Sequence, residues 1–295
     1  MKRAGSFLAI AWAVGGCASS DAPKGPADAG QAAVDGGALA TLDAGPPADA
    51  APPPQTEKEP NGGTPATDVN AMTVPGTISG AIDPANDTDV FTIAVSPGEM
   101  WEWTLAPVGA DFAPHLTVFD TAAGSLNPTR LVAGKSGAPS KLEHFVLRSG
   151  TFVAAVRDAR NVPTLAGKGG PTYKYTLTAA TKTPNVVPVT LPGSKTGTLA
   201  SLSSLDLYTL DGKAGAGFDI VIKAKRKTPP STLDSRMSLF DLTTKKTLIT
   251  NDDASGTSDS QIGGTFPSTG AYVVVVENEG TNAADLSYQI DFTPR

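Results

Sequence analysis

The chain has 295 residues, a formal net charge of −6 and a single cysteine, Cys17. One cysteine excludes an intramolecular disulfide. The acidic balance argues against a nucleic-acid partner, because phosphate binding needs a clustered basic face, and the short basic run at 223–227 is interpreted as a solvated strand end. With 31 glycines and 25 prolines but only 6% aromatic residues, the composition favours turns over long helices.

Residues 1–16 are typical of a secretory signal peptide. Lys2 and Arg3 precede a short apolar segment, SFLAIAWAVGG, which ends in small residues. This segment is shorter than the ~20 apolar residues that a membrane-spanning helix needs. We therefore expect an exported protein.

The sequence AVGGC at the end of this segment resembles the lipobox of bacterial lipoproteins. The resemblance implies cleavage before Cys17, lipidation of its thiol and a membrane anchor, with about 0.8 kcal/mol for each buried CH2 of the acyl chains. Val14 departs from the commoner leucine three residues before the cysteine. Ala18 stands where aspartate signals inner-membrane retention in that family, which implies the outer membrane, on its periplasmic face or the cell surface. The alternative is an ordinary signal peptide with an incidental cysteine.

Residues 17–56 are predicted to be a disordered linker. From residue 18 onward the segment is rich in Ala, Pro, Gly and Asp and contains no Phe, Trp or Tyr. Such a chain cannot bury enough apolar surface to offset the entropy lost on ordering. As a flexible coil it spans roughly 35 Å, so the remainder of the protein is expected to stand away from the membrane.

From residue 57 onward, short alternating runs are separated by Gly, Pro, Asn and Asp, which is typical of strands and turns. No segment shows a helical period. The pattern predicts an all-β protein built of antiparallel β-sandwiches. The expected strands of the first half lie near 77–82, 88–95, 100–106, 115–120, 129–133, 142–148, 150–157 and 173–180.

The second half of this region repeats the first. Residues 80–105 align without a gap on 197–222, and SGTFVAAVRD at 149–158 matches TGAYVVVVEN at 269–278. The repeat predicts two tandem domains, 57–181 and 182–295. Trp101 and Trp103 share one face of a strand, and we interpret them as core because the second copy has Phe218 and Ile220 there; the alternative is a platform for stacking sugars.

The order of these blocks resembles the bacterial pre-peptidase C-terminal domain family. The first copy has EPN at 59–61, DTDVF at 87–91, VFD at 118–120 and SGTFVAAV at 149–156. The second copy carries LDLY, LFD and TGAYVVVV in the same order. The resemblance implies jelly-roll-like β-sandwiches that are non-catalytic and accompany secreted peptidases, although no peptidase precedes them in this chain.

Acidic residues concentrate at the start of the first copy. Glu57, Glu59 and Asn61 alternate, so an extended chain directs their oxygens to one side. Asp87 and Asp89 add two carboxylates, and oxygen ligands of this kind suit Ca2+. Some members of the resembling family bind calcium with such an opening, but Gly62 replaces one expected aspartate. The alternative is an acidic linker end beside a turn in which Asp and Asn make local hydrogen bonds.

Four further aspartates are weaker candidates for metal binding, namely Asp83, Asp252, Asp253 and Asp259. Asp83 is a substitute for the missing ligand. The other three lie in NDDASGTSD, which does not match the calcium-loop pattern and is interpreted as a solvated turn.

The sequence predicts a protein that is not an enzyme. Its two histidines, His115 and His144, lie outside HExxH, and we expect both at the surface or at a strand edge. No GxSxG elbow is present.

The predicted function is therefore a non-catalytic, lipid-anchored envelope protein that presents two binding or scaffold modules to an envelope or extracellular protein or to a polysaccharide. The membrane is a partner through the anchor, and calcium is the expected cofactor. The first alternative is an accessory or inhibitory subunit of a separately encoded secreted peptidase. The second is a structural spacer.

Overall fold

A computed structural model of the chain describes residues 54–59, 70–120, 128–162, 166–254, 256–281 and 283–295. The predicted signal peptide 1–16, Cys17 and nearly all of the predicted linker lie outside these residues. The described part is built of strands, with a single short 3-10 turn, Ala159–Asn161. It forms two β-sandwiches, so the predicted fold class is confirmed.

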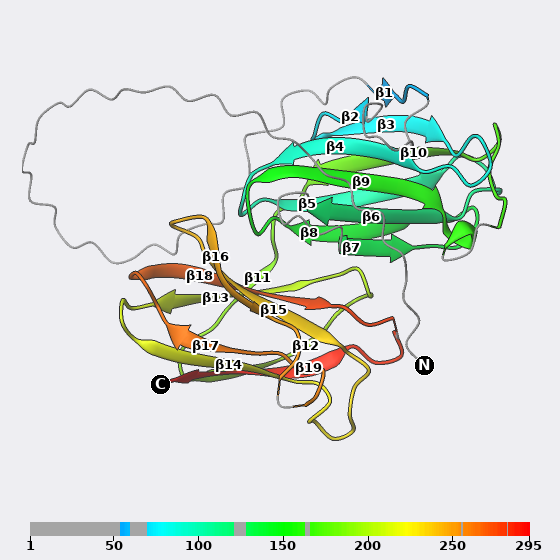
Figure 1. The fold of residues 1–295 in the computed structure, drawn as a ribbon. Coiled ribbons are helices and arrows are strands. Elements are labelled where there is room, and N and C mark those ends of the chain that lie inside the picture. The colour runs from blue at the N-terminus through cyan, green and yellow to red at the C-terminus, as the bar shows by residue number, and fades with distance from the viewer. Residues whose placement is uncertain (1–53, 60–69, 121–127, 163–165, 255, 282) are drawn as a thin grey trace, which may run out of the picture. The chain divides into compact units, whose positions relative to one another are not determined.

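The first sandwich, called module 1, contains β1 to β10. Its sheets have the orders β1-β3-β10-β5-β8 and β2-β4-β9-β6-β7, and they lie face to face in Figure 1. All strand pairs are antiparallel except the parallel pairs of the short β1 and β2. The strands are β1 (Gln55–Thr56), β2 (Asn70–Ala71), β3 (Gly76–Ala81), β4 (Asp89–Val95), β5 (Met100–Pro107), β6 (Pro114–Asp120), β7 (Pro128–Ala133), β8 (Ser140–Phe145), β9 (Gly150–Asp158) and β10 (Lys174–Thr181).

The second sandwich, module 2, contains β11 to β19. Its sheets have the orders β12-β19-β14-β17 and β11-β13-β18-β15-β16, which repeat the order of module 1 except that the short β1 has no counterpart. The strands are β11 (Val186–Pro188), β12 (Gly193–Thr198), β13 (Asp206–Gly212), β14 (Gly217–Lys223), β15 (Ser235–Asp241), β16 (Lys246–Asn251), β17 (Gln261–Thr265), β18 (Gly270–Asn278) and β19 (Ser287–Pro294).

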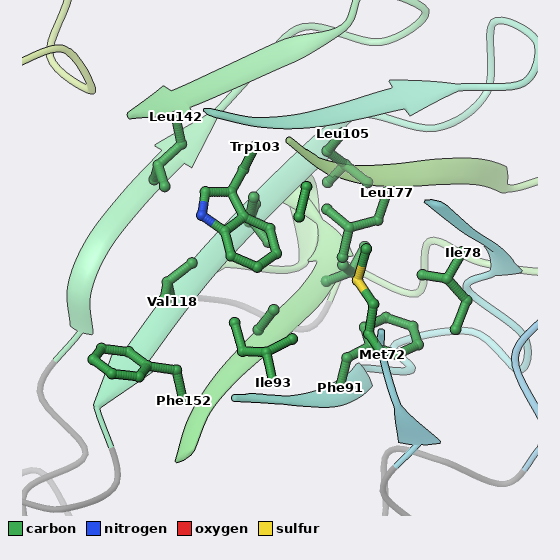
Figure 2. Packing of buried hydrophobic residues seen from close by; sticks show 14 of the residues in the cluster. Met72, Ile78, Phe91, Ile93, Trp103, Leu105, Val118, Leu142, Phe152 and Leu177 are labelled. Atoms are coloured by element: carbon green, nitrogen blue, oxygen red, sulfur yellow. The ribbon is translucent and has the colours of Figure 1, made fainter. Parts of the chain in front are cut away.

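Alternating side chains fill the space between the sheets of each module. In module 1, Trp103 lies between Leu142 and Val118, among aliphatic residues of both sheets (Figure 2). Trp101 belongs to the same cluster, and Phe218 and Ile220 are buried in module 2. The interpretation of these positions as core is confirmed.

Both histidines are buried, so the expectation of surface positions is wrong, although His144 does lie on an edge strand, β8. His115 is 6% exposed and His144 is 1% exposed. Burial lowers the pKa of His115 to about 4, with the charge of Arg157 as a second cause. Burial, followed by the charge of Arg130, lowers the pKa of His144 to about 3. Both imidazoles are therefore neutral at physiological pH and pack as apolar rings.

The two modules share a third apolar cluster, and their described residues belong to one compact unit. Met100 and Phe145 of module 1 pack with residues of module 2, and the rings of Phe145 and Phe240 meet edge to face with centroids 5.3 Å apart. The other buried members of the cluster are Leu205, Leu207, Leu242, Val273 and Val275.

Arg130 of β7 connects the modules through polar contacts. Its Nε donates to the carbonyl of Glu143 in module 1, at 2.9 Å. Its Nη2 donates to the carbonyls of Ser203 and Ser204, at 2.6 and 3.1 Å, and its Nη1 lies 3.1 Å from Glu277 Oε1 in module 2. Arg130 and Glu277 are each about 5% exposed. A buried charge pair of this kind is stable only when further hydrogen bonds satisfy its polar atoms.

Replacement of Arg130 by methionine is expected to reduce the free energy of unfolding by about 3–5 kcal/mol, because it leaves the Glu277 carboxylate buried without its cation. Chemical denaturation of the purified chain measures this loss. Arg236→Met is the matched control, since Arg236 lies 3.0 Å from a Glu279 side chain that is 42% exposed. Its expected cost is at most about 1 kcal/mol. Equal losses for the two variants would contradict a special role for Arg130.

Candidate metal site

The site forms where the chain enters module 1. β1 pairs with β3, and this contact continues as Glu57 N donates to the Ser79 carbonyl at 3.0 Å. Asn70 then accepts from Lys58 N at 3.0 Å and donates to its carbonyl at 3.1 Å. These bonds hold the segment extended, so Glu57 and Glu59 point to the same side.

Three carboxylates meet at this point. Glu57, Glu59 and Asp89 each offer an oxygen, and these oxygens lie within 4.8 Å of one another. Tyr175 Oη lies 2.9 Å from Glu57 Oε2 and 2.6 Å from Asp89 Oδ2. Because a hydroxyl carries one hydrogen, Tyr175 can donate to only one carboxylate, and the second bond needs a protonated acid.

The raised pKa of Asp89 favours this residue as the acid that carries the proton. Burial is the main cause that raises its pKa, to about 9; the charge of Glu57 adds to it, and the bond from Tyr175 opposes it. Burial also raises the pKa of Asp87, with Asp83 as a further cause. Within the described residues, Asp89 Oδ1 and Asp87 Oδ2 are buried without a hydrogen-bond partner.

These features fit a hard divalent cation. Ca2+ takes six to eight oxygen ligands from carboxylates, carbonyls and water, and a cation favours the ionised form of a buried acid. Glu57, Glu59 and Asp89 would supply carboxylate ligands. The buried Asp89, whose Oδ1 has no hydrogen-bond partner among the described residues, would then gain one.

The remaining predicted ligands of the first copy lie in different places. Asn61 lies outside the described residues. Asp87 sits in the turn before β4, where its Oδ1 accepts from Thr88 N at 2.7 Å. Asp83 is exposed and does not belong to the cluster of three carboxylates.

The weaker candidates of module 2 do not gather into such a cluster within the described residues. Asp259 is buried, and it accepts from the backbone N–H groups of Ala224, Lys225 and Arg226 and from Arg226 Nε. These donors lower its pKa against the effect of burial. Asp252 accepts from Asp253 N at 3.1 Å in an exposed turn. Asp259 therefore holds the backbone of residues 224–226 in place through hydrogen bonds.

Module 2 contains a related but different arrangement at the equivalent position. Tyr288 takes the place of Tyr175 and donates to Asp206 Oδ2 at 2.5 Å. The hydroxyl of Tyr208 lies 2.9 Å from that of Tyr288. Phe91 is the residue in module 1 that aligns with Tyr208, so in module 2 a second tyrosine hydroxyl replaces the Glu57 carboxylate.

Sequence reasoning missed Tyr175 as a member of the site. A usable signal was the closing strand, where YKYTLTA at 173–179 matches LSYQIDF at 286–292 and aligns Tyr175 with Tyr288. A second signal was Gly80, which aligns with Gly197. In each copy a Cβ on this glycine would lie 2.5 Å from an atom of the tyrosine.

No protein-family model matches the sequence, and no curated protein matches it. Among solved structures, similar chains include the pre-peptidase C-terminal domain of a Bacillus anthracis collagenase. It is 12% identical, with a TM-score of 0.30, and the match covers 38% of this chain and 98% of that one.

A second similar structure is PliG of Aeromonas hydrophila, a periplasmic inhibitor of g-type lysozyme. It is 17% identical, with a TM-score of 0.28, and the match covers 37% of this chain and 97% of that one. A protein of Eubacterium rectale is 13% identical, with a TM-score of 0.23, over 74% of this chain and 73% of that one. Similarities of this size carry no argument about ligand or partner.

The described residues contain no helix long and apolar enough to cross a membrane.

Gly80→Ala is expected to destabilise module 1 by about 1–3 kcal/mol, because the new Cβ would stand 2.2 Å from Glu57 Oε2 and 2.5 Å from Tyr175 Oη. Gly264→Ala is the matched control, since its Cβ would meet Phe218 at 3.6 Å, an ordinary contact. Thermal melting of both variants tests this. A Gly80→Ala protein as stable as the control would contradict the close packing of the site.

Proposed function

We propose that this chain is an exported, lipid-anchored and non-catalytic envelope protein. Its two β-sandwich modules act as a binding or scaffold unit for an envelope or extracellular protein or for a polysaccharide, and Ca2+ stabilises module 1. The observation that carries the calcium part is the group of Glu57, Glu59 and Asp89, whose oxygens lie within 4.8 Å of one another.

The non-catalytic part is supported by the state of the histidines. His115 and His144 are buried, and their lowered pKa values keep them neutral. A general base must reach the proton that it abstracts from a substrate, and neither ring is exposed to one. Hydrolase activity of the purified chain that depends on its own residues would contradict this part.

The divergence between the modules supports a role for the acidic cluster beyond folding. Module 2 keeps the fold with Asp206, Tyr208 and Tyr288 at the equivalent place. The carboxylates of Glu57 and Glu59 are therefore not needed to build this type of sandwich. Ion binding by module 1 accounts for their presence and for the orphaned oxygen of Asp89 beside them.

Millimolar Ca2+ is expected to raise the stability of the purified chain by on the order of 0.5–1.5 kcal/mol, which corresponds to the weak affinity of extracellular modules. Thermal melts with Ca2+ and with a chelator measure the shift. Asp89→Asn should remove the shift without destabilising the metal-free protein, because an amide is isosteric with the protonated acid.

Asp206→Asn is the matched control for this experiment and should leave the calcium shift intact. A wild-type chain that melts at the same temperature in Ca2+ and in chelator would overturn the proposed site. A shift that survives Asp89→Asn would place the ion elsewhere.

Lipidation of Cys17 predicts that the wild-type protein, expressed in a bacterium with two membranes, fractionates with the membrane and gains the mass of its acyl chains. Cys17→Ser should abolish both properties, since serine offers no thiol. Membrane fractionation and intact mass spectrometry measure them. Release of the wild-type protein in soluble form after cleavage would support the ordinary signal peptide instead.

A further inference from the structure

A groove of about 880 Å³ lies between the two modules. β7 supplies one wall. β16 and the segment around the end of β18 supply the other, which includes Asn251, Asn278 and Gly280. Arg130 lines the groove and has polar contacts with both modules. Preformed concave sites of this size at domain interfaces are typical of ligand binding.

The groove follows the edge of a sheet. β7 is the last strand of its sheet, with β6 on one side only, and Figure 1 shows it at the margin of module 1. The consecutive residues 130–133 all line the groove. Because neighbouring side chains of a strand point to opposite faces, a groove that all of them line must run along the strand's edge.

The backbone of this edge is open. Gly134 N donates to the Pro114 carbonyl at 2.7 Å, and β6 and β7 are antiparallel with Leu116 opposite Val132. Hydrogen-bonded pairs alternate along such a ladder, so the N–H and C=O groups of Leu131 and Ala133 point away from β6. From the segments that the structure describes, no hydrogen bond reaches these groups.

The side chains around the groove disfavour recognition by charge. Arg130, Arg148 and Arg236 line it together with Asp120, Asp252 and Glu279, so their formal charges cancel. Each arginine is already paired with a carboxylate of the protein. A large apolar side chain of the groove, Leu131, is 46% exposed. Open backbone groups beside one apolar side chain are features that an extended chain satisfies by adding a strand.

We propose that the groove binds an extended polypeptide segment of another protein, which pairs with the edge of β7 and places an apolar residue beside Leu131. This inference rests on the proposed function as a binding module and specifies its partner as a peptide rather than a polysaccharide. Backbone pairing makes the recognition tolerant of sequence, and the apolar contact sets the register.

The test is selection of a displayed library of random peptides on the purified full-length chain, with Leu131→Pro as the key variant. Proline removes the outward N–H, and it is tolerated at strand edges where that group does not join the ladder. Leu131→Thr is the control that keeps the backbone donor. Selected peptides should have apolar residues at alternate positions, bind Leu131→Pro at least about tenfold more weakly, and bind Leu131→Thr with a smaller loss.

Selected peptides that bind Leu131→Pro as well as wild type would overturn the proposal, as would the absence of any enrichment. N-methylation of alternate peptide nitrogens should abolish binding, and its failure to do so would also overturn backbone pairing. Capture of partners from the protein's own envelope separates the two levels of inference. Partners that Leu131→Pro retains would leave the proposed function standing and eliminate the groove as its site.

Discussion

The buried guanidinium of Arg130 is the interaction on which the arrangement of the two modules depends. Four contacts from three of its nitrogens reach Glu143 in one module and Ser203, Ser204 and Glu277 in the other. A charge taken out of water is stabilising only when its donors are satisfied in a fixed geometry. The apolar cluster around Phe145 and Phe240 buries surface between the modules. The hydrogen bonds of Arg130, in contrast, form only in one relative orientation of the groups that they join. Together these contacts form the interface between the two modules, and the groove lies beside it.

The two modules show how one fold accommodates different chemistry at the same place. Each has a tyrosine on its closing strand that meets an aspartate, and each leaves room for the ring with a glycine, Gly80 or Gly197. In module 2 the additional hydroxyl of Tyr208 lies beside that of Tyr288, which donates to Asp206. In module 1 two further carboxylates take this position, and their charges add to burial, the main cause, in raising the pKa of Asp89. The acidic arrangement costs stability unless a proton or a cation is present.

Much of the fold was predictable from the sequence because it depends on local alternation. All eight strands expected in the first copy are present, with ends that differ by at most three residues, and the repeat correctly matched strands such as β4 and β13. The short β1, β2 and β11 were not predicted, since two or three residues carry no period. The burial of His144 was also missed, because alternation identifies which face a residue occupies but not what covers that face.

The candidate site was predictable to the extent that its residues are close in sequence. Glu57 and Glu59 were found from their spacing, and Asp89 from its neighbouring aspartate. Tyr175 was missed because it enters from β10, 86 residues after Asp89, and only sheet pairing brings them together. The interface between the modules likewise depends on residues that are distant in sequence. Arg130 and Glu277 are ordinary charged residues in the sequence, and their role arises only when two sheet margins exclude water between them. The features specific to this chain thus lie in contacts between distant strands, where a duplicated domain can diverge while the alternation that defines its fold is kept.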